Sequence, residues 1–153
     1  MHVFDAPGIV CETDGVRVSA AKVRHPPLTH AYAYRFDAHD RSIVLSGDTS
    51  FCPEMIAFAQ GAEVLLHEVM YRDGIARLVA RVPQAASLRK HLLAAHTTTK
   101  EVGKVAAAAG ARTLVLNHFV PGDDPSITDD MWRADPRNDL DGRLIVGRDL
   151  QVI

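Results

Sequence analysis

Residues 42–68 read SIVLSGDTSFCPEMIAFAQGAEVLLHE and contain a strand–helix–strand unit. The apolar run 42–46 predicts a buried strand that ends in a loop. Pro53 suits the first turn of a helix, where its missing N–H costs nothing, and Gly61 is a natural stop for that helix. The apolar run 62–66 then predicts a second strand. This alternation is typical of an α/β layer.

Comparable patterns extend this unit in both directions. Period-2 alternation predicts half-buried strands before it, and three- and four-residue apolar spacings predict helices after it. The clearest helix carries a capping box formed by Thr98 and Glu101 and stops at Gly110. The other predicted elements are strands at 16–23 and 31–36, a helical stretch at 72–91 broken at Pro83, a strand at 113–116, a short turn capped by Thr128 that carries Trp132, and closing strands at 144–146 and 150–153. We therefore expect a single α/β domain over residues 1–153, with one mixed sheet.

Length and composition place the chain in a broad class. With 153 residues, 47% of them hydrophobic, it is long enough for one buried core. The net charge of −2 neither implies nor excludes a nucleic-acid partner. Cys11 and Cys52 lie far apart and no secretory signal precedes them, so we expect free thiols and a cytoplasmic protein. No apolar run reaches the roughly 18 residues of a membrane helix, so no membrane association is expected.

Potential ligand or acid/base groups follow three of the apolar runs. Asp48 comes after the first run, His67-Glu68 after the second and His118 after the strand at 113–116. In open α/β sheets, ligand groups collect beyond the carboxyl ends of the strands, so these ends are expected to face one site. A single His or Asp at such a position is more often a satisfied structural group. The convergence of several therefore carries more weight than any one of them.

Two of the eight histidines have a further distinctive context. His25 precedes Pro26-Pro27, which holds the backbone extended and fixes the direction of the side chain. His96 precedes the capped helix, where free N–H groups favour an anionic oxygen, or it is merely the flank of that helix. We interpret four other histidines as surface or structural residues: His2, His30, His39 and His91.

The helical stretch at 72–91 is basic. Its positive side chains are Arg72, Arg77, Arg81, Arg89 and Lys90. They could face an anionic substrate, but an ordinary solvated helix face is the interpretation that we favour.

The ordered motifs resemble those of a known family. In chain order they are the segment Val18–Phe36 with His25, then Ser46-Gly47-Asp48-Thr49, Leu66-His67-Glu68, His96-Thr97-Thr98 and Leu114-Val115-Leu116-Asn117-His118. This series resembles metallo-β-lactamase-fold hydrolases of the ribonuclease Z and arylsulfatase-like branch. The resemblance spans almost the whole chain and corresponds to the C-terminal half of that fold. It implies half of an αββα sandwich, with one mixed sheet that carries helices on one face.

The resemblance also implies roles for five residues. His25 matches the third histidine ligand of a first zinc ion, Asp48 the carboxylate that bridges two zinc ions, and His118 the last ligand of the second ion. Glu68 and His96 match the catalytic pair that helps to donate a proton to the leaving group. The residue types agree with these roles, because imidazole and carboxylate groups suit zinc and a glutamate can hold an imidazole for proton donation.

One departure from the family is large. The HxHxDH motif that supplies four further ligands is absent, since no two histidines here are separated by a single residue. Each zinc ion would be left with two ligands, so partial or absent occupancy is expected. A half sandwich also leaves one sheet face bare, including Val18, Ala20, Tyr32, Tyr34, Ile43 and Leu45. We therefore expect a truncated chain that forms a homodimer or binds a complementary N-terminal half.

These features lead to two main functional hypotheses. The first is a zinc-dependent hydrolase acting on a phosphodiester, sulfate ester or related small anionic ester, incomplete in this chain. The second is a non-catalytic, self-associating remnant that binds metal weakly or not at all. An unrelated metal-free α/β binding protein would require the motif series to be coincidental. The sequence does not identify the substrate.

Overall fold

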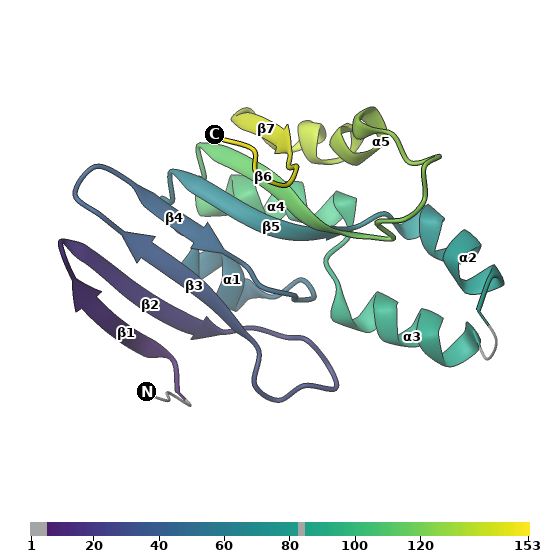
Figure 1. Ribbon diagram of the computed structural model, residues 1–153, viewed down its shortest axis with the longest axis horizontal. Helices are drawn as coiled ribbons and strands as arrows, with labels where there is room; N and C mark the ends of the chain where they lie inside the picture. The colour runs from purple at the N-terminus through teal and green to yellow at the C-terminus, as the bar shows by residue number, and fades with distance from the viewer. Residues whose placement is uncertain (1–5, 83–84) are drawn as a thin grey trace.

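The computed structural model describes residues 6–82 and 85–153, so His2 and Pro83 lie outside the described residues. Its centre is one seven-stranded sheet whose strands follow the order of the chain (Figure 1). The first four strands pair antiparallel and the last four pair parallel, which makes the expected mixed sheet. The strands are β1 (Gly8–Thr13), β2 (Val16–Lys22), β3 (Tyr32–Asp37), β4 (Ser42–Leu45), β5 (Val64–Met70), β6 (Thr113–Val120) and β7 (Arg143–Val146).

One face of the sheet is covered by helices, as expected. The helices are α1 (Pro53–Phe58), α2 (Arg72–Ala80), α3 (Ala85–Ala95), α4 (Thr99–Ala109) and α5 (Asp129–Ala134), with a short 3₁₀ turn at Pro136–Asn138. Figure 1 shows α1 and α4 behind the sheet. The row Val44, Leu65, Leu114 and Leu144 runs across four strands in register and belongs to the core that includes α4 residues. This burial stabilises the sheet by removing apolar surface from water.

The opposite face presents a second apolar row. Strand register places the following residues side by side across six strands: Ala20, Tyr34, Leu45, Leu66, Val115 and Ile145. Among the described residues, no helix lies in front of β1 to β4, whereas the C-terminal coil passes in front of β6 (Figure 1). The face is therefore apolar and only partly covered.

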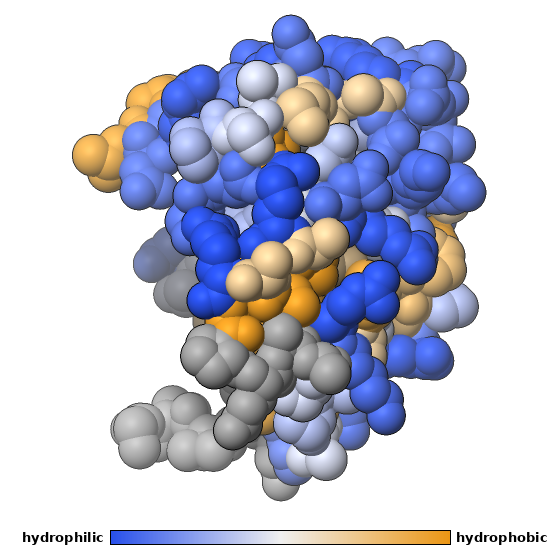
Figure 2. Space-filling model, turned by 90° about the vertical axis from the view of Figure 1, so that its right-hand side faces the viewer, coloured by the Kyte–Doolittle hydropathy of each residue, from blue (hydrophilic) through white to orange (hydrophobic). Residues whose placement is uncertain are grey.

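The hairpin of α2 and α3 extends beyond the carboxyl ends of β5 and β6. Ile75 of α2 and Leu92 of α3 pack with Met70 and Val120, which end those two strands, in a second small core. Figure 2 looks onto this end of the molecule and shows mostly hydrophilic side chains around a small apolar area. The hairpin therefore borders the edge of the sheet at which the predicted site residues lie.

Local signals predicted most elements but not all. The capping box of Thr98 and Glu101 is present, Gly110 ends α4 in the left-handed conformation, and the Thr128 side chain accepts a hydrogen bond from the Met131 N–H. Strand β1 was not predicted, because it is an edge strand with almost every residue exposed and no core-facing alternation. The predicted strand at 150–153 is wrong, since this segment is coil. Within the described ranges, none of the helices has the length and apolar character needed to cross a bilayer.

Candidate active site

Five predicted site residues lie at the carboxyl edge of the sheet. His25 follows β2, Asp48 follows β4, Glu68 is in β5, His118 is in β6, and His96 lies between α3 and α4. The ring centroids of His25 and His96 are 5.2 Å apart, and those of His96 and His118 are 5.7 Å apart. The fold therefore brings together residues separated by up to 93 positions in the sequence.

Asp48 and His118 face each other directly. The Asp48 Oδ2 and His118 Nε2 atoms are 3.4 Å apart, and both side chains are partly exposed. A register shift between β5 and β6 leaves His118 as an extra residue with a positive φ of 41°. Such bulges redirect a side chain at the expense of regular pairing. The bulge thus turns His118 towards the loop that carries Asp48.

Glu68 is the buried anchor of the site. Its Oε1 accepts hydrogen bonds from the backbone N–H groups of Thr49 (3.1 Å) and Thr97 (3.0 Å), and lies 3.2 Å from His96 Nδ1. Its Oε2 is buried and has no hydrogen-bond partner among the described residues. The Thr97 hydroxyl also donates to the Thr49 carbonyl at 2.6 Å. Glu68 and Thr97 therefore fix the Asp48 loop and the His96 segment to each other.

Both His25 and His96 are held through Nδ1. In the tautomer protonated at Nδ1, His25 donates a hydrogen bond to the carbonyl oxygen of Ala95 at 3.1 Å. In the same tautomer, His96 donates from Nδ1 to Glu68 Oε1 at 3.2 Å. Metal-binding histidines typically donate their second ring N–H to a carbonyl or carboxylate group. Each imidazole is therefore oriented with its Nε2 available for a ligand or a proton.

The donor set at this edge fits zinc. Two ligands of one tetrahedral zinc ion, each bonded at about 2.0–2.2 Å, lie about 3.3–3.5 Å from each other. The 3.4 Å separation of the Asp48 and His118 atoms falls in this range. A second grouping consists of Glu68, His96 and His118, whose potential ligand atoms all lie within 4.8 Å of one another. The geometry thus offers two alternative ligand sets that share His118.

His67 lies outside the site although it follows the same apolar run as Glu68. Strand alternation places it with Leu65 and Val69 on the helix-covered face, where it is fully buried. Burial lowers the pKa of His67, opposed by the hydrogen bond from its Nδ1 to the Glu68 carbonyl oxygen. His67 is therefore a neutral structural imidazole.

Three residues of the site were assigned no role in it from the sequence. Thr49 and Thr97 participate through the contacts with Glu68 described above. His91, interpreted as a surface residue, is exposed, but its ring centroid lies 6.2 Å from that of His25 in an edge contact. His91 and Ala95 are four residues apart on α3 and so lie on one helix face. Only this helical spacing could have linked His91 to the site, once Ala95 was known to contact His25.

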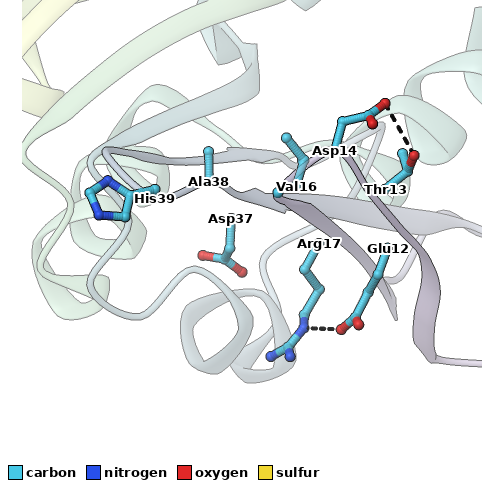
Figure 3. Close-up of a pocket in the computed structure, with 9 residues that line it drawn as sticks. Glu12, Thr13, Asp14, Val16, Arg17, Asp37, Ala38 and His39 are labelled. Carbon is cyan, nitrogen blue, oxygen red and sulfur yellow. Dashed lines mark hydrogen bonds and ion pairs between the residues drawn. The ribbon is translucent and has the colours of Figure 1, made fainter.

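A separate groove lies at the opposite end of the sheet. It has a volume of about 570 Å³ and is lined by residues of the β1–β2 and β3–β4 turns (Figure 3). Glu12, Asp14 and Asp37 make it largely acidic, and Arg17 is paired with Glu12. This groove is remote from the five converging residues and disfavours anionic ligands.

Known proteins resemble this chain in sequence and in fold. It is 33% identical over its whole length to "Ribonuclease Z" of Mycobacterium bovis and 34% identical over 95% of its length to "Ribonuclease Z" of Mycobacterium marinum. The chain spans about half the length of these curated relatives, 52% and 50% respectively.

Solved structures show the same fold. The metallo-β-lactamase fold protein YhfI of Bacillus subtilis matches 94% of this chain with a TM-score of 0.69 and 23% identity, and the match covers 50% of that protein. The short form of human tRNase Z matches 96% of the chain with a TM-score of 0.61 and 17% identity, over 45% of its own length. The family model described as "Beta-lactamase superfamily domain" matches residues 5–119. The chain therefore belongs to the beta-lactamase superfamily.

Proposed function

We propose that this chain supplies half of the active site of a zinc-dependent phosphodiester hydrolase. The observation that carries the proposal is the 3.4 Å approach of Asp48 Oδ2 to His118 Nε2, beside the oriented His25 and His96 rings. The ribonuclease Z relatives favour a phosphodiester over a sulfate ester as substrate. The remaining ligands would come from a segment that contains the HxHxDH motif.

Each residue has a definite proposed role. His25 and Asp48 would hold one zinc ion, and Asp48 and His118 the other. When bound, the two ions would polarise the scissile phosphate and acidify the attacking water. Glu68 holds His96 through Nδ1, so that a proton on Nε2 of His96 can pass to the leaving oxygen. Glu68 and Thr97 keep the Asp48 loop in place during this transfer.

Metal titration tests the proposed ligand set. The chelator-treated chain should show weak but saturable binding of Zn²⁺ by calorimetry and of Co²⁺ by visible absorption. Asp48→Asn, His118→Ala and His25→Ala should each lower affinity by at least about tenfold, since loss of even an outer partner typically costs about 10–100-fold. His39→Ala, which removes an exposed imidazole at the other end of the sheet, is the matched control.

The same titration decides between the two ligand sets. If His96→Ala and Glu68→Gln abolish binding while His25→Ala and Asp48→Asn do not, the second grouping holds the metal instead. Absence of saturable binding in the unmodified chain would contradict the proposal and favour a non-catalytic role. Combined with a segment that supplies the HxHxDH ligands, the metal-loaded chain should hydrolyse bis(p-nitrophenyl) phosphate faster than p-nitrophenyl sulfate, because the proposed substrate is a phosphodiester.

The open sheet face favours self-association as the second candidate function. Its apolar row across six strands is only partly covered. A stable interface usually buries about 800 Å² on each partner. We expect a homodimer at micromolar concentration, measured by sedimentation velocity, unless a complementary half occupies this face. Leu45→Lys should shift the population to monomer, whereas Ile9→Lys on the edge strand should not. A monomer at all concentrations would contradict the dimer.

A further inference from the structure

Two buried oxygen atoms near the carboxyl ends of β5 and β6 have no hydrogen-bond partner among the described residues: Glu68 Oε2 and Asn117 Oδ1. Buried acceptors are rarely left unpaired, because each has lost its hydrogen bonds to water without a replacement. The cost is greatest for a carboxylate, which carries charge. Each of these two oxygens therefore needs a hydrogen-bond donor.

The strand register places the two residues side by side. Glu68 and Asn117 are direct partners in the parallel pairing of β5 and β6 (Figure 1). Partners in a parallel ladder point to the same face of the sheet, which is here the open face, two positions beyond Leu66 and Val115. They form the last pair before the register shift that precedes Val69. The two unpaired oxygens thus belong to neighbouring side chains at the edge that carries the candidate active site.

The missing donor must come from within this chain. Both oxygens are already shielded from solvent in the chain by itself, so a protein that covered the open face could not reach them. The backbone N–H groups of Thr49 and Thr97 are used by Glu68 Oε1, and the Thr97 hydroxyl donates to the Thr49 carbonyl. The side-chain amide of Asn117 carries two N–H groups and lies beside Glu68 in the register.

Rotation of the Asn117 amide by half a turn about its Cβ–Cγ bond accounts for both oxygens at once. The oxygen and the nitrogen exchange places, and because the two groups are nearly equal in size the packing is kept. An N–H group then occupies the buried position. The oxygen turns towards the cavity of about 320 Å³ that Asn117 lines together with His118, where water can reach it.

We propose that Asn117 is a positioning residue of the active site, whose amide N–H donates a hydrogen bond to Glu68 Oε2. The proposal rests on the proposed function for the role of His96 as proton donor. Glu68 Oε1 already meets His96 Nδ1 at 3.2 Å. A hydrogen bond to Oε2 stops the carboxylate from turning about its Cγ–Cδ bond and so keeps Oε1 directed at the imidazole. Asn117 therefore acts on His96 through Glu68.

The first test uses the unmodified, metal-free chain labelled with ¹⁵N. NMR should show one side-chain N–H of Asn117 that exchanges with solvent at least about tenfold more slowly than those of Asn138, because a buried hydrogen bond must open before exchange. Asn138 is an exposed asparagine in the 3₁₀ turn. Exchange of both Asn117 N–H groups as fast as those of Asn138 would overturn the proposal.

Variants test the connection to His96, whose ring nitrogen resonances report which nitrogen carries the proton. Asn117→Leu keeps the size of the side chain but removes the donor. It should lower the ratio of the Nδ1–H to the Nε2–H form about fivefold, since the loss of one hydrogen bond usually changes an equilibrium constant by about this factor. Asn117→Thr supplies a hydroxyl donor on a residue suited to a strand, and should restore the ratio to within about twofold. Asn138→Leu is the matched control and should leave it unchanged.

An unchanged ratio in Asn117→Leu would contradict the proposal. So would ring resonances of His118 that shift as much as those of His96, because the strand end would then be distorted as a whole. If circular dichroism shows that Asn117→Leu does not fold, the exchange measurement on the unmodified chain decides.

None of these measurements uses zinc or a substrate. A protected Asn117 amide in a chain without saturable Zn²⁺ binding would support the role of Asn117 and contradict the proposed function. Saturable Zn²⁺ binding in a chain whose Asn117 amide exchanges freely would retain the proposed function and overturn the role of Asn117.

Discussion

Replacing Glu68 with alanine is expected to lower the free energy of unfolding by about 3–5 kcal/mol, the usual cost of breaking a buried charged network. The side chain is 1% exposed, and its Oε1 accepts from two backbone N–H groups and from His96. Alanine would leave the N–H groups of Thr49 and Thr97 buried without acceptors, and each would carry a desolvation penalty. Urea unfolding followed by circular dichroism measures this loss.

Two further variants separate hydrogen bonding from burial. Glu68→Gln keeps an acceptor oxygen of the same size and should cost only about 1–2 kcal/mol. Glu63→Ala, just before the other end of β5, removes a partly exposed carboxylate and should change stability by less than about 0.5 kcal/mol. If Glu68→Ala and Glu63→Ala were equally mild, Glu68 could not be the anchor of the site.

Replacing Gly47 with alanine should destabilise the chain and weaken metal binding together. Gly47 has a φ of +59°, and an added Cβ would lie 2.7 Å from the backbone oxygen of Tyr32. The left-handed conformation alone costs an L-residue about 1–2 kcal/mol, and the clash with backbone atoms adds to this cost. We expect a loss of about 3 kcal/mol, because the loop must move away from β3. Asp48 would move with it, so Zn²⁺ affinity should fall at least about tenfold.

Gly61 provides the matched control for this prediction. Its φ of +66° is almost the same, but an added Cβ would have nothing within 4 Å. Gly61→Ala should therefore show only the conformational cost, with unchanged Zn²⁺ affinity by calorimetry. Equal losses of stability in the two variants would mean that the contact with Tyr32 does not constrain the Asp48 loop.

The sequence by itself determined the parts of this protein that depend on neighbouring residues. The apolar runs that form β4, β5 and β6 and the capping box of α4 are local signals, because hydrophobic periodicity and capping act within a few residues. The placement of Asp48, Glu68 and His118 at or near strand ends also followed from these runs, since parallel strands share one carboxyl edge.

Only the tertiary structure decided how these groups meet. Three features join segments that are 19 to 70 residues apart: the bulge that turns His118 towards Asp48, the three contacts of Glu68 Oε1, and the edge contact of His91 with His25. The tertiary structure also decided the partners of two arginines of the α2–α3 hairpin, because Arg77 and Arg81 pair with carboxylates in a loop more than 40 residues away. Such contacts depend on the packing of whole elements against one another, which local periodicity does not encode.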